Sequence, residues 1–163
     1  MVVIDDFIKN SRVLTKVNYD PFFYQAGKHW WNGWWNTPAS SLRHEVINHI
    51  FNENPPVAIQ AISGFLHEAN IIKSDAPLQM EVPKDCILRT IYYSDPETDN
   101  SKGGQLQLGS SENYELINPK YNRLVIFDPS QGCDVQPVVE GVQKVLVIDL
   151  LETYPNTVPD LLF

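Results

Sequence analysis

The sequence predicts a mainly β protein with the layout of a β-sandwich or jelly roll, preceded by a helical N-terminal part. After Pro56, apolar and polar residues alternate in about eight short runs, spaced roughly 8–12 residues apart as in such folds. Clusters of Asn, Asp, Ser, Gly and Pro separate these runs and are typical of turns. With 163 residues, of which 43% are hydrophobic, the chain is long enough to bury one core.

The N-terminal part contains the expected helices. A short strand is expected at Val2–Ile4, and the segment Phe7–Val17 is weakly helical. Ser40–Phe51 is expected to form an amphipathic helix, because its apolar residues recur at helical spacing and serines at its start can cap it. Prolines at 55 and 56 end this helix.

The remainder is expected to consist of strands and one tail. The chain is predicted to be a single domain over residues 1–163, with a helical and aromatic-rich part at 1–56, a β core at 57–152 and a tail at 153–163. The expected strands of the core are Val57–Gly64, Leu78–Val82, Cys86–Tyr93, Gly104–Leu108, Tyr114–Ile117, Arg123–Phe127, Val135–Val139 and Gln143–Leu150.

An aromatic patch extends from Tyr19 to Trp35. Each aromatic ring can remove roughly 150–250 Å² from water, so this segment can cover the core as a loop. The alternative interpretation is a surface that binds a partner protein. Its candidate partner-binding residues are Trp30, Trp31, Trp34 and Trp35.

Charge and cysteine content exclude several classes of function. The net charge of −8 and the isoelectric point of about 4.8 disfavour nucleic-acid binding, because too few cations are available to replace phosphate counterions. No apolar run approaches the roughly 20 residues of a membrane helix, and no basic segment typical of a secretory signal precedes Phe7. Two cysteines, Cys86 and Cys133, cannot form a disulfide framework, so a cytoplasmic protein is the expectation.

Three segments of the β part resemble the iron- and 2-oxoglutarate-dependent dioxygenases, in the prolyl-hydroxylase-like branch. They are Ile91–Asp95, Gly103–Leu108 and Asn118–Asp128, the last continuing through Val135–Val138 to Gly141. Their order and spacing match the family over about residues 57–152, and Val3–Phe7 is similar to a common start of such proteins. The resemblance implies a double-stranded β-helix.

The resemblance also implies where an iron site would lie. The family holds Fe(II) with a His-x-Asp or His-x-Glu pair and a distal His, and an Arg binds 2-oxoglutarate. The first pair falls at Gln79 and Glu81, the distal His at Cys133, and the Arg at Gln143. A carboxylate is therefore retained as Glu81, whereas both histidines and the Arg are replaced.

The remaining histidines do not restore the site. The chain contains no His-x-Asp or His-x-Glu pair, and structural or solvent-facing roles are expected for its four histidines: His29, His44, His49 and His67. Cys133 is expected to be a small, semi-buried hydrophobe rather than a nucleophile.

Arg89 motivates a sharper hypothesis. Arg89, Ile91 and Tyr93 share one face of a strand, and the resemblance directs that face into the pocket. Arg89 would then replace the missing cation and pair with Glu81, because either charge buried alone is costly. The alternative is that the side chain extends to the mouth of the barrel.

These observations favour a non-catalytic protein that lacks iron and 2-oxoglutarate and acts as a structural or assembly module. Proteins that resemble this branch are frequent in tailed bacteriophages, so a neck, tail or capsid-associated virion component is one expectation. We expect protein partners in a homo- or hetero-oligomeric assembly, with neither nucleic acid nor membrane, in the cytoplasm or the virion. The alternatives are an active Fe(II)/2-oxoglutarate dioxygenase with atypical ligands and a cupin-type barrel that binds a small molecule.

Overall fold

The computed structural model describes residues 1–12, 28–32, 63–72, 75–79, 82 and 84–151. Its strands are β1 (Val2–Ile4), β2 (Lys28–Asn32), β3 (Ser63–Ile72), β4 (Leu78–Gln79), β5 (Cys86–Tyr92), β6 (Leu106–Gly109), β7 (Tyr114–Ile117), β8 (Leu124–Phe127), β9 (Cys133–Val135) and β10 (Val142–Leu151). Two short 3₁₀ helices, η1 (Asn100–Lys102) and η2 (Pro129–Gln131), lie in the connections.

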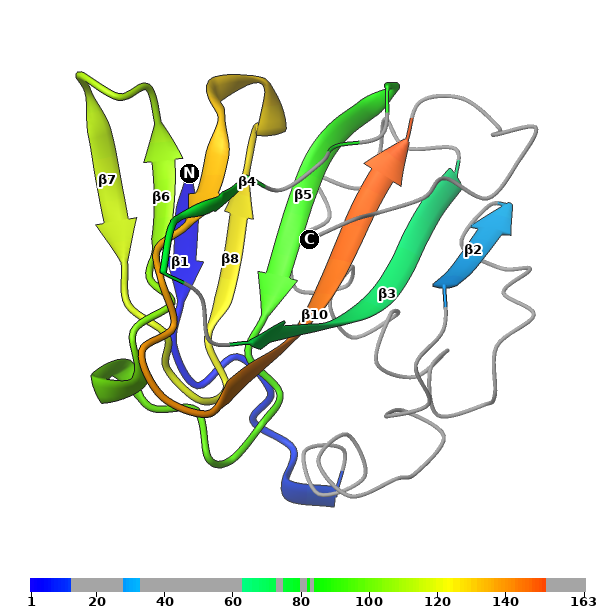
Figure 1. The fold of residues 1–163 in the computed structure, drawn as a ribbon. Coiled ribbons are helices and arrows are strands. Elements are labelled where there is room, and N and C mark those ends of the chain that lie inside the picture. Colours follow the sequence, from blue (N-terminus) through cyan, green and yellow to red (C-terminus); the bar gives the residue numbers. More distant parts are fainter. Residues whose placement is uncertain (13–27, 33–62, 73–74, 80–81, 83, 152–163) are drawn as a thin grey trace.

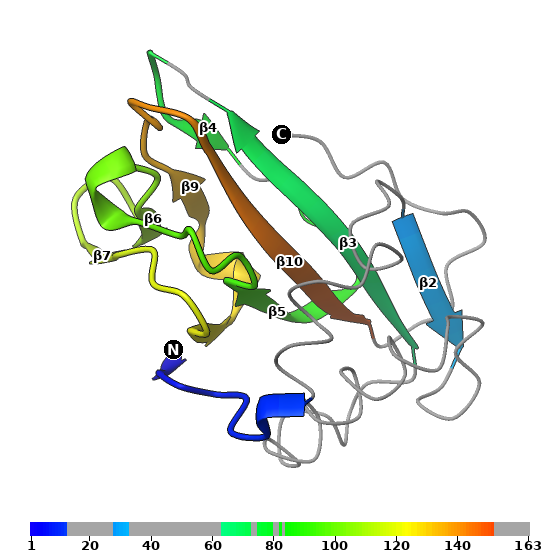
Figure 2. The same ribbon diagram turned by 90° about the horizontal axis from the view of Figure 1, so that it is seen from below.

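The strands form two antiparallel sheets. The larger sheet has the order β1-β8-β5-β10-β3-β2, and the smaller has the order β4-β9-β6-β7 (Figure 1). Seen from below, β6, β7 and β9 form a layer beside the long strands β10 and β3 (Figure 2). The prediction of a mainly β, jelly-roll-like fold is confirmed.

Alternation along the strands builds the core between the sheets. Ile91, Val125 and Val147 of the larger sheet are fully buried, as are Leu106 and Val135 of the smaller sheet. Because side chains on a strand alternate between its two faces, each strand contributes every second residue to this core. In the smaller sheet the inward row across the strands is Leu78, Val135, Leu106 and Ile117, and the outward row is Gln79, Asp134, Gln107 and Leu116.

Several strand boundaries differ from the expected ones; β9, for example, is Cys133–Val135 instead of Val135–Val139. β3 extends to Ile72, beyond the end of the expected strand Val57–Gly64, and all ten of its residues pair with β10; residues 57–62 of the expected strand lie outside the described residues. β2 lies inside the aromatic patch, at a position expected to be a loop, and pairs with β3. These pairings join segments that are distant in sequence, and local patterns do not encode them.

The predicted N-terminal helices remain largely untested. The helix expected at Ser40–Phe51 lies outside the described residues. Within Phe7–Val17 the structure describes residues 7–12, of which 7–10 are irregular and Ser11 and Arg12 are helical. No helix among the described residues is long and apolar enough to cross a membrane.

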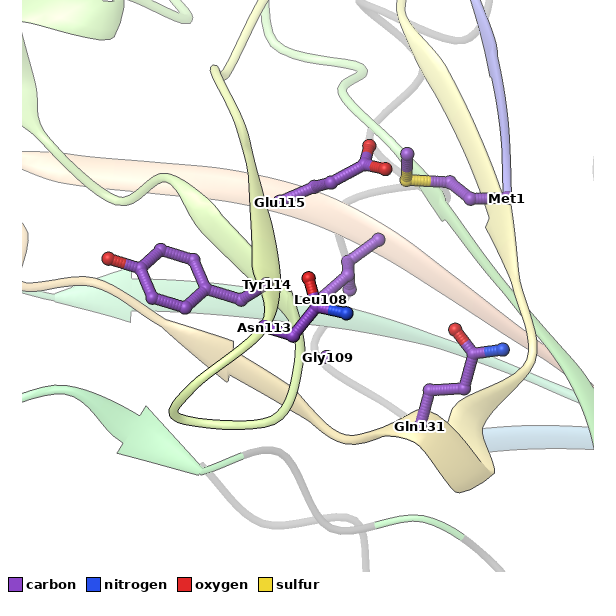
Figure 3. Close-up of a pocket in the computed structure, with 7 residues that line it drawn as sticks. All are labelled: Met1, Leu108, Gly109, Asn113, Tyr114, Glu115 and Gln131. Carbon is purple, nitrogen blue, oxygen red and sulfur yellow. The ribbon is translucent and has the colours of Figure 1, made fainter.

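A pocket lies where the free edges of the two sheets meet. It has a volume of about 140 Å³ and lies between the start of β1 and the β6–β7 hairpin (Figure 3). Its lining residues are Met1, Leu108, Gly109, Asn113, Tyr114, Glu115 and Gln131.

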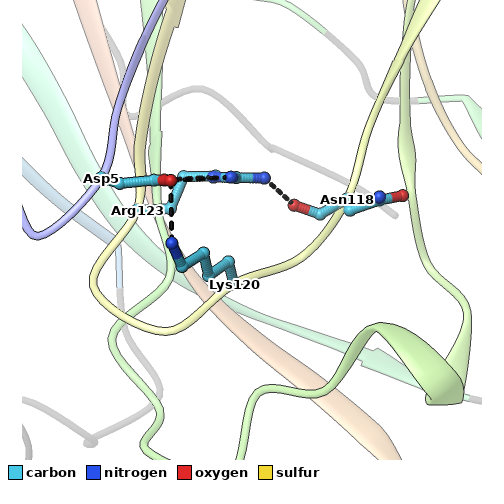
Figure 4. A network of polar contacts seen from close by, with 4 residues as sticks. All are labelled: Asp5, Asn118, Lys120 and Arg123. Carbon is cyan, nitrogen blue, oxygen red and sulfur yellow. Dashed lines mark hydrogen bonds and ion pairs between the residues drawn. The ribbon is translucent and has the colours of Figure 1, made fainter.

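Ion pairs attach the N-terminal segment to the β7–β8 connection. Arg123 donates from Nε and Nη2 to the two carboxylate oxygens of Asp5, at 2.6 and 3.0 Å, and Lys120 Nζ lies 2.8 Å from Asp5 Oδ2 (Figure 4). The hydrogen bonds from Arg123 and then from Lys120 hold the pKa of Asp5 well below its ordinary value.

Asn122 connects the same segment to the core. Its side-chain Oδ1 accepts from Ile8 N at 3.1 Å and from Tyr92 Oη at 2.8 Å, while its Nδ2 donates to Ile8 O at 3.1 Å. The residue is 5% exposed and has a φ of 59°, a left-handed conformation that Asn tolerates better than most residues. Asn122 thus satisfies buried polar groups on two separate segments.

Replacing Asn122 by Ala is expected to lower the free energy of unfolding by about 3 kcal/mol, because buried partners lose their hydrogen bonds and Ala is strained at positive φ. Asn122→Gly removes the strain and isolates the loss of hydrogen bonds. Urea denaturation measures both, with the exposed Asn113→Ala as the matched control. A change below about 1 kcal/mol in Asn122→Ala would contradict the assigned role.

Asp5→Asn is expected to weaken the dependence of the free energy of unfolding on pH at acid pH. The pKa of Asp5 in the folded state lies below its ordinary value of 3.8, so its stabilisation is complete above about pH 5 and is lost progressively as the pH falls further. Urea denaturation at a series of pH values measures this effect. Asp6→Asn removes the same charge outside the network and should retain the wild-type acid dependence; equal profiles for the two variants would contradict the assignment.

Candidate functional site

Strands β5 and β10 place an arginine and an aspartate side by side in the interior. Arg89 is directly opposite Asp149, and the next inward pair along the two strands is Ile91 opposite Val147, which belongs to the core. Arg89 is 1% exposed and Asp149 is fully buried. Both charges therefore lie on the face that the two sheets enclose.

The two side chains form a bidentate ion pair. Arg89 Nε is 2.7 Å from Asp149 Oδ1, and Arg89 Nη2 is 2.8 Å from Asp149 Oδ2. Burial alone would lower the pKa of Arg89, but the hydrogen bond and the charge of Asp149 outweigh it and raise that pKa. The interior thus contains a permanent cation with its own counter-ion.

Two thiols accompany this ion pair. Cys86 Sγ lies 3.1 Å from Leu88 O and 3.5 Å from Asp149 Oδ1. Cys133, at the start of β9, is 5% exposed, and the charges of Arg89 and this thiol are close enough to interact. Burial raises the pKa of Cys133 to about 12 and raises that of Cys86 even further, so both thiols are protonated at neutral pH.

Gln143 connects β10 to the loop around η1. Its buried side-chain Nε2 donates to Asp99 O at 2.7 Å and to Gly103 O at 3.2 Å. Gly104 lies so close that a Cβ there would be 3.2 Å from Cγ of Gln143. The side-chain amide of Gln143 therefore acts as a hydrogen-bond donor to main-chain carbonyl groups.

Two buried polar atoms on the same side of the sheet lack a described hydrogen-bond partner. They are Tyr93 Oη and Gln143 Oε1, and neither has a partner within the part of the chain that the structure describes. Burial raises the pKa of Tyr93, so its hydroxyl stays protonated.

The structure corrects one placement from the sequence. Gln79 is exposed and lies on the outer face of the smaller sheet, whereas its neighbour Leu78 packs against the core. A ligand at position 79 would point away from the space between the sheets, so the first position of the pair was assigned to the wrong face. Glu81, Trp34 and Trp35 lie outside the described residues, and Trp30 and Trp31 lie in β2.

The structure places Arg89 in the interior, as the inward hypothesis requires. Its observed partner is Asp149, which the sequence analysis did not consider; the pairing with Glu81 remains a hypothesis because Glu81 is not described. A signal for Asp149 existed in the sequence. It is an acid within the otherwise apolar run Val145–Leu151, at the same parity as the buried residues Val145 and Val147.

Comparisons with solved structures identify the fold. A prolyl-4-hydroxylase from Pseudomonas putida superposes with a TM-score of 0.62 at 11% identity, covering 94% of this chain and 92% of the other. A 2OG-Fe(II) oxygenase family oxidoreductase from Burkholderia pseudomallei superposes with a TM-score of 0.60 at 11% identity, covering 93% and 84%. The chain has the 2OG-Fe(II) oxygenase fold. A viral collagen prolyl hydroxylase from Paramecium Bursaria Chlorella virus-1 shares this oxygenase fold, with a TM-score of 0.56 at 12% identity over 94% and 96% of the chains.

At these identities the likeness shows the fold alone. No family model matches the sequence, and no curated protein matches it. Chemistry must therefore be argued from the residues of this chain.

The described residues at the expected site do not fit Fe(II) and 2-oxoglutarate. Iron of this class takes imidazole and carboxylate ligands, whereas position 133 is a cysteine and Gln79 is an amide on the outer face of the smaller sheet. Gln143 has no charge to attract a carboxylate. Within the described ranges, no group of three or more His, Cys, Asp or Glu residues is arranged to hold a metal ion.

A double-mutant cycle tests the ion pair. Arg89→Met and Asp149→Leu should each lower the free energy of unfolding by about 3–5 kcal/mol, because each leaves one buried charge uncompensated. The double variant should lose much less than the sum of the two, since it buries neither charge. Guanidinium denaturation measures all three proteins, and additive losses would contradict mutual dependence of the two charges.

Proposed function

We propose that this chain is a non-catalytic protein of the 2OG oxygenase fold that acts as a structural or assembly module. One observation supports the proposal: the buried ion pair of Arg89 and Asp149 lies on the face that the two sheets enclose, and both of its charges act on Cys133, the position expected for a metal ligand. The guanidinium of Arg89 and the carboxylate of Asp149 balance each other, so this carboxylate is not left free to bind a metal ion. The proposed protein therefore uses neither Fe(II) nor 2-oxoglutarate.

The surroundings of Gln143 support the same proposal. In a catalytic relative this position would carry a cation for the distal carboxylate of 2-oxoglutarate. Here the amide donates to Asp99 O and Gly103 O and thereby anchors the η1 loop to β10. The proposed role of Gln143 is therefore to stabilise the fold, and not to bind a charged co-substrate.

A place in a viral particle is part of the proposal. Proteins resembling this branch are frequent in tailed bacteriophages, and a viral protein is among those of the same fold. Virion parts act through contacts with other chains, so the proposed partners are protein subunits in a homo- or hetero-oligomer. The proposed location is the virion or the host cytoplasm.

A second candidate function is a barrel that binds a small molecule. Tyr93 Oη and Gln143 Oε1 favour it, because both are buried without a hydrogen-bond partner among the described residues. Such atoms in native proteins usually have a partner, which a bound neutral molecule would supply. High-resolution electron density beside these two atoms would distinguish such a molecule from water.

Metal and turnover measurements test the leading proposal. Protein purified anaerobically with added Fe(II) should contain far less than one iron per chain by elemental analysis. It should also form no succinate from 2-oxoglutarate under conditions in which the Pseudomonas putida prolyl-4-hydroxylase is active. Stoichiometric iron together with succinate formation would overturn the proposal and establish an active dioxygenase with atypical ligands.

A further inference from the structure

Exposed apolar residues gather on the free edges of the two sheets. The described residues include six large hydrophobic side chains that are exposed, and five of them lie on β7 or at β1: Met1, Val2, Val3, Tyr114 and Leu116. The sixth, Val139, lies elsewhere. β1 and β7 are the terminal strands of their sheets, and the edge pocket connects them (Figure 3). The edge pocket is the pocket described above, between the start of β1 and the β6–β7 hairpin. We call these five residues together with the edge pocket the edge surface.

The main chain of β7 is available for further pairing. In the β6–β7 hairpin, Ser110 N donates to Asn113 O, so residues 110 and 113 form a hydrogen-bonded pair. Such pairs alternate along an antiparallel ladder, which makes Glu115, opposite Leu108, the next hydrogen-bonded residue of β7. The N–H and C=O groups of Tyr114 and Leu116 therefore point away from β6, toward the open edge.

The edge pocket supplies a negative charge beside this edge. Among its lining residues, Glu115 has the only charged side chain; this side chain extends toward Met1, which carries the α-amino group of the chain, whereas the ring of Tyr114 points away (Figure 3). Met1 and Leu108 provide apolar surface, and the amides of Asn113 and Gln131 provide further polar groups. An aliphatic stem that ends in a cation matches this lining, because the stem can pack on Met1 and Leu108 while the charge meets Glu115.

We propose that β7 binds an extended segment of a partner protein in which a Lys or Arg lies between two apolar residues. The segment adds a strand to the smaller sheet by hydrogen bonding to Tyr114 and Leu116. Its two apolar side chains lie on the outer face beside those of Tyr114 and Leu116, and its cation, opposite Glu115, enters the edge pocket. This inference rests on the proposed assembly role and names the partner chemistry.

Charge favours a basic segment of another protein over a second copy of this chain. The chain has a net charge of −8, so two copies repel each other. No Lys or Arg lies within β7 itself, so an antiparallel pair of β7 strands would not supply the cation opposite Glu115.

Synthetic peptides test the proposal with the full-length protein. The probe is acetyl-Ser-Val-Lys-Val-Ser-amide, and binding is measured by ¹⁵N-resolved NMR titration. We expect a weak dissociation constant of about 1 mM or tighter, with shifts centred on β7. The same peptide with Glu in place of Lys should bind about tenfold more weakly, and a peptide with Pro in place of the second Val should lose a main-chain donor and also weaken.

Matched variants separate the edge surface from unspecific apolar binding. Glu115→Gln should weaken binding of the Lys peptide about two- to fivefold and abolish the preference for Lys over Glu. Leu116→Glu should weaken binding of the Lys peptide about tenfold, whereas Val139→Glu, at an exposed apolar residue outside the edge surface, should leave it unchanged. Each variant is first checked for the wild-type midpoint of thermal unfolding.

Three results would overturn the inference. They are equal binding of the Lys and Glu peptides, equal loss in Val139→Glu and Leu116→Glu, and a dimer of the free protein that Leu116→Glu dissociates in sedimentation velocity. The last result would assign the edge to a second copy. The iron and succinate measurements are independent of these titrations, so failure of the edge inference is distinguishable from failure of the proposed function.

Discussion

A buried guanidinium and a buried carboxylate depend on each other at the centre of this protein. Arg89 and Asp149 are almost completely removed from water, and each would be costly to bury without the other. Their bidentate contact requires that β5 and β10 pair in one register, because a shift by one residue would turn one of the side chains to the opposite face. The ion pair thus connects the charge balance of the interior to the pairing of the two central strands.

The ion pair lies in the interior, where the resemblance to oxygenases implies a metal site. A double-stranded β-helix with an open metal site needs ligands whose side chains point inward. These ligands are neutral imidazoles or deprotonated carboxylates. In this chain the interior has a permanent cation, two protonated thiols and an apolar side chain at Leu78. The site residues Tyr93 and Cys133 belong to the apolar core that holds the two sheets together.

Sequence patterns located several elements well because local periodicity encodes them. The strands Val2–Ile4 and Tyr114–Ile117 have the predicted bounds, and Cys86–Tyr92 differs from its predicted bounds by one residue. The similarity to oxygenases, inferred from three short segments, agrees with the fold found by structural comparison. The register between distant strands could not be predicted from local sequence patterns. Gln79 was expected to face inward, and its pairing with β9 places it on the outer face.

The sequence by itself determined that the chain is mainly β and that Cys133 and Gln143 stand where the resemblance expects a His and an Arg. Only the tertiary structure decided that Asp149 is a partner of Arg89, 60 residues away in sequence, and that Leu78 rather than Gln79 faces the core. The physical reason is that periodicity depends on neighbouring residues. The partner of a buried charge and the inward face of a two-residue strand are instead set by long-range strand pairing.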